Sequence, residues 1–344
     1  MSRRSLYLAV GSAALMLAAS CTDSPTRVAA PSTSVPSFDQ GGAPNAAAAQ
    51  NPDRHVFFLR SDTAAINAAH GGGGGGGGGK TTNTGISYHG GPVIYSPAVA
   101  AIYWSSGTIY NNGPTPGTAG AGSADGSLVG YFLAHLGGSG YWNINNTYYD
   151  GTGTHVANSL AYTQYWAADG NVPASGASVS DAQVQAEVVA GFTSGALTYD
   201  RSTLYVVFSG PGVNLGGGFG SQYCAYHGHF TWGGNDVKYA VMPYAQTYPS
   251  ACTAGSNISP NTDPAAAAEV NVLAHETEET ATDEDLNAWY DRRGYENADK
   301  CAWNFGTTQT GTSGTFNQTI GGVNWLIQMN WVNAGSGGCL QHWP

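Results

Sequence analysis

The segment DPAAAAEVNVLAHETEE, residues 263–279, is the most clearly marked helix in the sequence. Asp263 is of a residue type that caps helix N-termini, and Pro264 suits the first helical position, where a backbone N–H has no partner within the helix. His275 and Glu279 are four residues apart, so they project from one face of the helix, about one turn from each other. The segment therefore predicts a capped helix that presents the pattern H-E-x-x-E.

Apolar, β-branched and aromatic runs before this helix predict buried strands at residues 99–104, 204–208 and 239–242. Two further helices are expected at residues 127–136 and 180–192, and the second has cap-like residues at its start and valines at helical spacing. Strands that alternate with helices predict a layered α/β fold. We expect one domain with a mixed central sheet, against which the H-E-x-x-E helix packs.

The H-E-x-x-E pattern differs in one position from a metallopeptidase motif. In H-E-x-x-H two histidines hold zinc, and the glutamate between them takes a proton from water at the metal. By analogy, His275 and Glu279 are the expected zinc ligands, and Glu276 is the expected catalytic base. A carboxylate ligand shifts the preference toward harder ions, so calcium is the alternative cofactor. The alternative without a metal is a solvated acidic helix end, in which His275 caps the helix or packs against other side chains.

Acidic residues are concentrated around this motif, because ten of the 22 lie between residues 269 and 299. Such a density of negative charge favours a bound cation. One helix face cannot supply every ligand, since eight helical residues cover about 12 Å, so the chain has to turn back toward the metal. Asp283, Glu296 and Asp299 are the candidate further ligands. An EF-hand loop beginning at Asp283 is excluded, because Ala288 stands at its glycine position and Gly294 at its bidentate glutamate position; an irregular calcium site stays open.

The first residues read as a bacterial export signal, with Arg3 and Arg4 ahead of an apolar run at residues 6–19. This run is shorter than the roughly 20 residues that span a membrane. Residues 1–20 are therefore the expected signal peptide, and LAASC, which ends at Cys21, resembles a lipobox. We expect a lipid on Cys21 and a place in the cell envelope, at the outer membrane or cell surface. Without the lipid the protein would be secreted.

Residues 21–86 are rich in Ala, Ser, Pro, Thr and Gly and include nine consecutive glycines at residues 71–79. This composition predicts a disordered tether, which leaves residues 87–344 as the globular domain. Residues 55–59 are an apolar exception that fits a short docked strand, and they show no chemistry of their own.

Net charge and cysteine content limit the partners and the cellular compartment that the protein can have. The whole chain has a net charge of -11, and loss of Arg3 and Arg4 with the signal peptide makes it more acidic, so nucleic acid is excluded as a partner. Four cysteines remain beyond Cys21, an even number that predicts two disulfides in an exported protein. No C-x-x-C pair supports a cysteine zinc site. Nearness in sequence favours one of the three pairings, Cys224 with Cys252 and Cys301 with Cys339.

Three segments in order, YHGGPV (88–93), LYVVF (204–208) and YCAYHG (223–228), resemble the phosphate-induced protein 1 or EXORDIUM family of secreted proteins. The resemblance extends over most of residues 87–339. Plant members are extracellular proteins linked to growth responses, and they lack the H-E-x-x-E residues. They keep the histidine that matches His227 although they lack that set, which favours a structural role for it. His227 is expected on a loop that a disulfide at Cys224 would fix, and it is ranked as a second-tier metal ligand.

The segment from His275 onward is instead similar to bacterial relatives with H-E-x-x-E-A-x-T-D-P, a W-Y-D stretch and E-I-G-D-x-C. Four positions depart from that pattern, namely Thr280, Glu284, Asn297 and Ala298, whereas its histidine and acidic positions are kept. The resemblance implies a metal-dependent role and supports Asp283, Glu296 and Asp299 as ligands.

Taken together, the sequence predicts an exported, lipid-anchored, EXORDIUM-like zinc endopeptidase that acts on a protein or peptide substrate. The alternative is a non-enzymatic cell-surface or cell-wall protein with at most a structural calcium site. Elemental analysis distinguishes the two, since zinc favours the enzyme and calcium favours the scaffold.

Overall fold

A computed structural model describes residues 54–60, 85–254 and 259–344. Its centre is one sheet of seven strands in the order β1-β9-β10-β7-β3-β5-β4. The strands of this sheet are β1 (Arg54–Phe57), β3 (Ala98–Trp104), β4 (Ala119–Ala121), β5 (Ala161–Trp166), β7 (Thr203–Ser209), β9 (Ala225–Trp232) and β10 (Asn235–Met242). The described residues all belong to one compact unit of the chain.

The sheet is mixed, as expected. Strands β3, β5, β7 and β10 run parallel to their neighbours in the middle, whereas the pairs β1/β9, β9/β10 and β4/β5 are antiparallel. Every residue of β3 and β7 is buried, because layers cover both faces of the sheet there. This explains why these strands appear in the sequence as continuous apolar runs rather than alternating ones.

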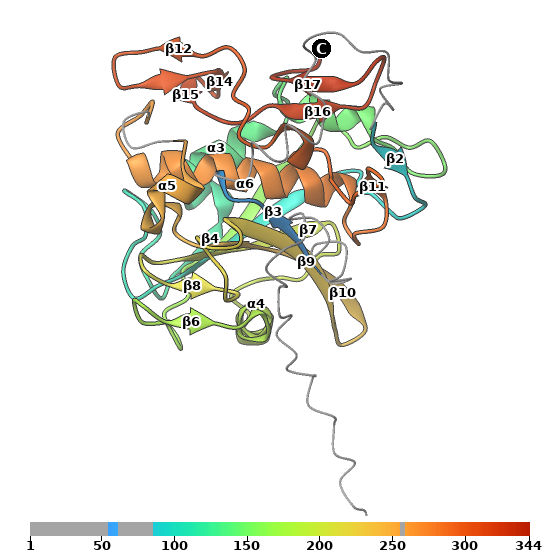
Figure 1. Cartoon of the computed structure of the whole chain (residues 1–344). Coiled ribbons are helices and arrows are strands. Elements are labelled where there is room, and N and C mark those ends of the chain that lie inside the picture. The colour runs from blue at the N-terminus through green and yellow to red at the C-terminus, as the bar shows by residue number, and fades with distance from the viewer. Residues whose placement is uncertain (1–53, 61–84, 255–258) are drawn as a thin grey trace, which may run out of the picture. The chain divides into compact units, whose positions relative to one another are not determined.

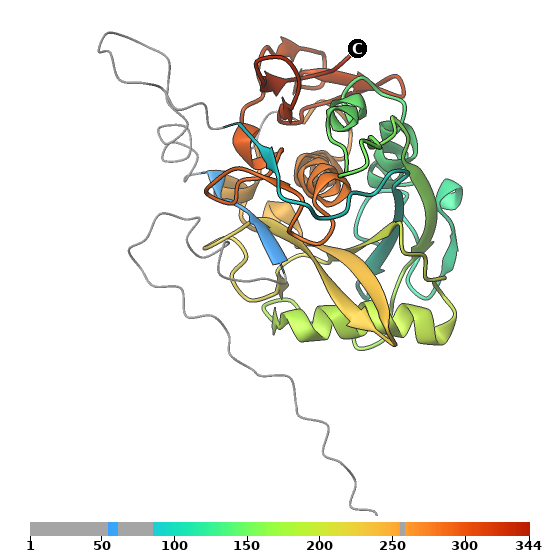
Figure 2. The same ribbon diagram turned by 90° about the vertical axis from the view of Figure 1, so that its right-hand side faces the viewer.

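The α-helices of the described residues that flank the sheet are α3 (Leu128–Leu136), α4 (Asp181–Ser194), α5 (Pro249–Cys252) and α6 (Pro264–Thr282). Figure 2 shows α4 on one side of the sheet and α6 on the other. The two expected caps are present: Ser180 accepts from a backbone N–H at the start of α4, and Asp263 accepts from two N–H groups of α6. Ser127 caps α3 in the same way. The layered α/β prediction is confirmed.

The C-terminal region adds a further layer over α6 (Figure 1). It consists largely of short antiparallel pairs: β12 (Gln309–Thr310) with β13 (Thr315–Phe316), β14 (Gln318–Ile320) with β15 (Val323–Trp325), and β16 (Asn330–Val332) with β17 (Gly338–Leu340). Because α6 lies between the sheet and this layer, almost its whole circumference is buried, including its polar residues.

Smaller elements complete the chain. Strand β2 (Ser87–Tyr88) pairs with β11 (Trp289–Tyr290), and β6 (Ser178–Val179) pairs with β8 (Asn214–Leu215). Short 3-10 helices cover Gly122–Ala124, Trp142–Thr147, Ala245–Thr247 and Asp299–Cys301.

Two disulfides join the cysteines in the favoured pairing. Cys224 is bonded to Cys252, and Cys301 is bonded to Cys339. Disulfides persist in oxidising surroundings, so this pairing indicates an extracellular environment. Among the described helices, none is long and apolar enough to cross a membrane.

Strand β1 lies within the stretch that the sequence analysis assigned to the tether. In the structure Arg54–Phe57 pairs with β9 at the edge of the central sheet, and Phe57, Phe58 and Leu59 are buried. An apolar segment of this kind gains more from burial than a Gly-rich one, which explains why it docks. Residues 1–53 and 61–84, which include the signal peptide, Cys21 and most of the tether, lie outside the described residues, so those expectations stay predictions.

Candidate metal centre

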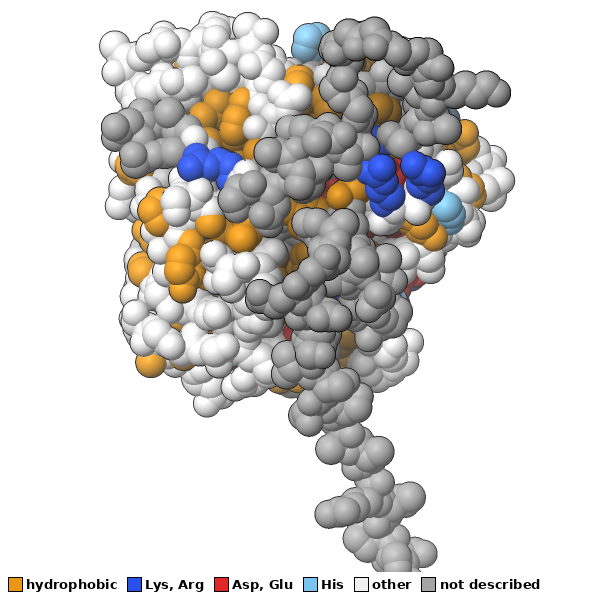
Figure 3. Space-filling view, in the orientation of Figure 1, with side chains coloured by type: hydrophobic (Ala, Val, Ile, Leu, Met, Phe, Trp, Pro, Cys, Tyr) orange, Lys and Arg blue, Asp and Glu red, His pale blue; other side chains and the backbone are white. Residues whose placement is uncertain are grey.

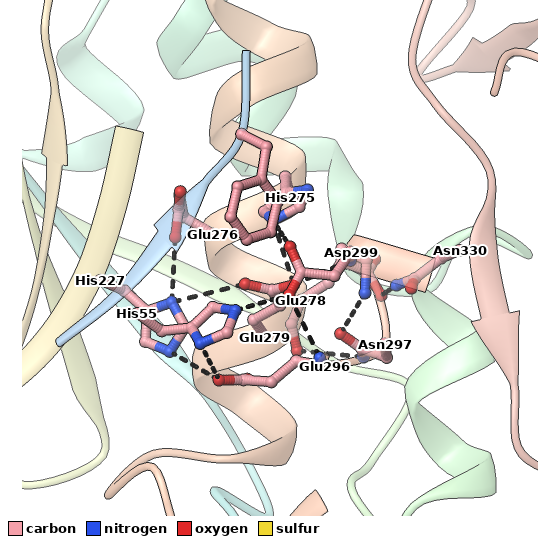
Figure 4. Close-up of polar contacts among 12 residues, drawn as sticks. His55, His227, His275, Glu276, Glu278, Glu279, Glu296, Asn297, Asp299 and Asn330 are labelled. Atoms are coloured by element: carbon pink, nitrogen blue, oxygen red, sulfur yellow. Dashed lines mark hydrogen bonds and ion pairs between the residues drawn. The ribbon is translucent and has the colours of Figure 1, made fainter. Parts of the chain in front are cut away.

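The carboxyl-terminal half of α6 carries the H-E-x-x-E residues toward the sheet edge formed by β1 and β9 (Figure 4). His275, Glu276 and Glu279 are each completely buried. His275 Nε2 lies 3.0 Å from Glu279 Oε1, one helical turn away. The one-face geometry expected from the spacing is therefore present.

The chain turns back after α6 and brings Asp299 to the same place. Asp299 begins the 3-10 helix that ends at the disulfide-bonded Cys301. Its Oδ1 lies 3.4 Å from His275 Nε2, and its backbone N–H donates to Glu279 Oε1 over 2.9 Å. This hydrogen bond ties the loop at Asp299 to α6 through the Glu279 carboxylate.

Strand β9 contributes His227, which was predicted as a second-tier metal ligand. Its Nδ1 is hydrogen-bonded to Glu276 Oε2 over 2.9 Å, and its Nε2 lies 3.7 Å from Glu296 Oε1 without a hydrogen-bond partner. Burial lowers the pKa of His227 well below its usual range, and nearby imidazoles lower it further, so the ring is neutral. A metal-binding histidine commonly has this form, with one N–H on a carboxylate and a lone pair on the other nitrogen.

Strand β1 supplies a fourth side chain that sequence reasoning missed, His55. Its Nε2 lies 2.5 Å from Asp299 Oδ2, and its Nδ1 lies 3.4 Å from Glu296 Oε1. Burial alone would lower the pKa of His55, but Asp299 raises it to about 9. The only available signal was the alternation of polar and apolar residues in RHVF, and no spacing connects it with α6.

Among the described residues, the basic side chains paired with the carboxylates of this centre are imidazoles. Among the described residues, no lysine or arginine forms an ion pair with Glu276, Glu279, Glu296 or Asp299. Buried atoms without a hydrogen-bond partner face one another here: His227 Nε2, His275 Nε2, Glu276 Oε1, Glu279 Oε2, Glu296 Oε2 and Asp299 Oδ1. Buried charge without a partner is costly, and a bound cation is a common remedy.

Two overlapping sets of side chains have ligand atoms within 4.8 Å of one another. One consists of His55, Glu279 and Asp299, and the other of His227, Glu276 and Glu279. Glu279 belongs to both sets. This mixture of nitrogen and oxygen donors suits zinc, whereas calcium is usually bound by oxygen alone.

Burial and the closeness of these carboxyl groups also determine their pKa values. Burial raises the pKa of Glu276 and of Glu296 well above the usual range, and neighbouring carboxylates add to the rise for Glu296. For Asp299, burial is outweighed by His55 and His275, which lower its pKa. In the absence of a cation, Glu276 and Glu296 are therefore held in the protonated form, whereas Asp299 is ionised beside the His55 and His275 imidazoles.

Gln328 fixes the orientation of the His275 ring. Its Nε2 donates to His275 Nδ1 over 3.1 Å and to the Ala298 carbonyl over 2.9 Å, while its Oε1 accepts from the Trp303 N–H. With Nδ1 accepting, a neutral His275 carries its proton on Nε2, toward Glu279. His275 can bind a cation through Nε2 only if Gln328 turns its amide, at the expense of its other two hydrogen bonds.

Asp283, another predicted ligand, lies at the C-cap of α6. Its Oδ1 accepts from the backbone N–H groups of Asn287 and Ala288, and burial raises its pKa to about 7. These contacts hold the loop after the helix. Glu278 is buried as well, but its Oε2 accepts from Asn330, away from His227 (Figure 4).

A second acidic cluster lies nearby and is half-exposed: His229, Asp236 and Asp285. Here Lys238, whose side chain is buried, forms ion pairs with Asp236, Asp285 and Glu284. A lysine ammonium already occupies the position that a cation would take. On the face in Figure 3, little acidic surface is visible outside the grey atoms.

Comparison with known proteins gives one match. The model of the phosphate-induced protein 1 conserved region matches residues 135–320, which include α6, β9 and Asp299 but not β1. No curated protein and no solved structure matches the chain. This chain belongs to the phosphate-induced protein 1 family.

Proposed function

We propose that this protein is an exported, metal-dependent hydrolase, a zinc endopeptidase of the cell envelope. One observation carries the proposal: buried carboxylates and imidazoles converge on the H-E-x-x-E face of α6, and no lysine or arginine among the described residues is paired with those carboxylates. The contacts within this set leave several buried donor atoms without a hydrogen-bond partner, and a divalent cation would complete them.

Glu279 and Asp299 would hold the ion together with an imidazole, for which His227 has the favourable tautomer. Glu296 would add a further oxygen. His275, predicted as a ligand, would bind only after Gln328 turns. When bound, zinc would polarise a substrate carbonyl and favour attack by water.

Glu276 is the proposed base. Its Oε2 is held by the N–H of His227, and its Oε1 is buried without a partner. That free oxygen can accept a proton from water and later return it to the leaving amine. Burial raises the pKa of Glu276, which brings a carboxyl closer to the range that suits proton transfer at neutral pH.

The test combines elemental analysis of the purified protein with a protease assay on an unfolded protein substrate. We expect bound zinc, and a Glu276→Gln variant that keeps its zinc but cleaves at least about 100-fold more slowly. A zinc-free parent with all four centre carboxylates intact would contradict the proposal, as would a Glu276→Gln variant as active as the parent.

A second candidate is the non-enzymatic surface protein with a structural calcium ion. The complete burial of the centre favours it, because a structural ion needs no access for substrate. Its weakness is the set of imidazoles, which calcium seldom uses. Calcium in the elemental analysis, together with no proteolysis, would support this candidate over the enzyme.

The proposed location is the cell envelope, with a lipid on Cys21 as the membrane anchor. The disulfides and the lipobox-like LAASC support export and anchoring. Mass spectrometry of the mature protein should find an acylated N-terminal cysteine, and Cys21→Ser should release the protein into the medium. Release of the parent itself would indicate a secreted protein. The proposed partner is a protein or peptide substrate, or else the cell wall.

A further inference from the structure

Strand β1 closes the metal centre from the edge of the sheet. It pairs with β9 alone, in antiparallel register, so that His55 lies opposite His227 and Phe57 lies opposite Ala225. Side chains alternate along a strand, and therefore His55 and Phe57 both point toward α6. Figure 2 shows β1 beside α6 at this edge.

The two inward side chains of β1 fill the space over the H-E-x-x-E face. His55 reaches Asp299, and the Phe57 ring stacks on His275 with ring centroids 3.9 Å apart and on Trp303 at 4.8 Å. On the opposite face of β1, Arg54 lies over the Tyr226 ring at 5.3 Å. With β1 in place, His275 and Asp299 have no solvent exposure.

An extended protein substrate can reach this covered centre only by displacing β1. Such an exchange is direct if β1 occupies the place of the substrate. Adding an antiparallel strand to a sheet edge is a general way in which proteins bind extended peptides: the main chain gives affinity, and pockets for alternate side chains give specificity.

We propose that the edge of β9 facing α6 is a binding groove for an extended peptide, and that β1 is an internal occupant of this groove. The inference rests on the proposed function for the view that the bound peptide is a substrate. The contacts of β1 define the class of ligand: an aromatic side chain in the place of Phe57, and a cationic one three residues earlier, in the place of Arg54.

The chain allows β1 to leave while it stays attached. Residues 61–84 join it to the body and include the nine consecutive glycines. At about 3.3–3.6 Å per residue, this stretch reaches several tens of Å when extended. An attached strand competes at an effective concentration in the millimolar range, which keeps the groove closed to weak ligands.

The experiment uses the full chain in a Glu276→Gln background, so that binding is measured without cleavage. A site for a sequence-specific protease replaces seven of the nine glycines at residues 71–79, and the chain is cut there. A fluorescent peptide with the sequence of residues 53–60 is then added, and its anisotropy reports binding. A peptide with Phe57→Ala is the matched control.

We expect the cut chain to bind the labelled peptide at least about tenfold more tightly than the uncut chain. The control peptide should bind at least about tenfold more weakly than the parent peptide. If the cut chain retains its own strand, a cut chain with Phe57→Leu, whose own strand is weakened, should exchange it for the labelled peptide.

Failure of both cut chains to bind the peptide, with unchanged circular dichroism and both disulfides intact, would overturn the groove. Zinc is measured in the same samples to separate the two proposals. Zinc without peptide binding rejects the groove and leaves the metal proposal standing. Peptide binding without zinc rejects the peptidase and leaves the groove standing.

Discussion

The buried centre around Glu279 and the half-exposed cluster around Asp236 are built from similar side chains but are neutralised differently. Both contain carboxylates, and each receives a histidine from β9, His227 in the first and His229 in the second. The second cluster has Lys238 in its middle and Arg201 at its rim. In the described part of the chain, neither a lysine nor an arginine pairs with the carboxylates of the first cluster, although it is more deeply buried.

This difference shows how the fold treats buried negative charge. Where carboxylates need a permanent counter-charge, the sequence supplies a lysine, and the cluster is complete within the protein. Where imidazoles rather than a lysine or arginine meet the carboxylates, protons or a cation from outside have to balance the remaining charge. A set of acidic residues in the sequence does not distinguish these cases; the position of the lysine does.

The largest effect is expected for Glu279→Gln, because Glu279 belongs to both ligand sets. We expect zinc affinity, measured by competition with a chelating dye, to fall by about 100-fold or more. Glu278→Gln is the matched control, since Glu278 is equally buried on α6 but contacts Asn330. Equal loss in the two variants would show that the effect is on folding rather than on the metal.

Lys238→Met tests the second cluster. Removing the ammonium leaves Glu284, Asp236 and Asp285 without it, and we expect the free energy of unfolding to fall by about 4 kcal/mol, measured in urea. Arg201→Met is the control: its side chain is 58% exposed, so its loss should cost less than about 1 kcal/mol. Similar losses in the two variants would contradict the role given to Lys238.

Glu269→Gln tests burial of a carboxyl elsewhere on α6, outside both clusters. Burial raises the pKa of Glu269 from 4.5 to about 8. Between these pH values the folded state keeps a proton that the unfolded state loses, so the free energy of unfolding falls as the pH rises. The amide does not titrate. We expect the variant to be more stable than the parent by about 3 kcal/mol at pH 7 and to lose the advantage near pH 4. Parallel pH profiles would contradict this.

The smallest effect is expected for His229→Ala. Because Lys238 already neutralises that cluster, zinc affinity should change by less than about twofold, whereas His227→Ala should lower it at least about tenfold. Titration of both variants with zinc makes the comparison. A larger loss of zinc affinity in His229→Ala than in His227→Ala would place the ion in the half-exposed cluster and contradict this prediction.

Local signals predicted much of this architecture. The caps of α4 and α6 and the apolar runs of β3 and β7 are determined by residues near in sequence, and they lie where the sequence placed them to within a few residues. The same holds for His275 and Glu279, whose proximity follows from helix geometry alone.

Long-range features could not be predicted in this way. His55 meets Asp299 only because β1 joins the sheet beside β9, a pairing that no local pattern encodes. His227 was expected on a loop fixed by the Cys224 disulfide, but it lies on β9, whose sequence contains glycine and histidines that weaken a strand pattern. Asp283 accepts from backbone N–H groups through Oδ1, its Oδ2 is buried without a partner, and its role as a ligand stays a prediction.

Anomalous scattering from crystals at the zinc edge tests the central claim most directly. We predict a peak about 2.0–2.2 Å from carboxylate oxygens of Glu279 and Asp299, with His227 among the neighbours. A peak at His229, Asp236 and Asp285 instead, or no peak in zinc-equilibrated crystals, would contradict the account.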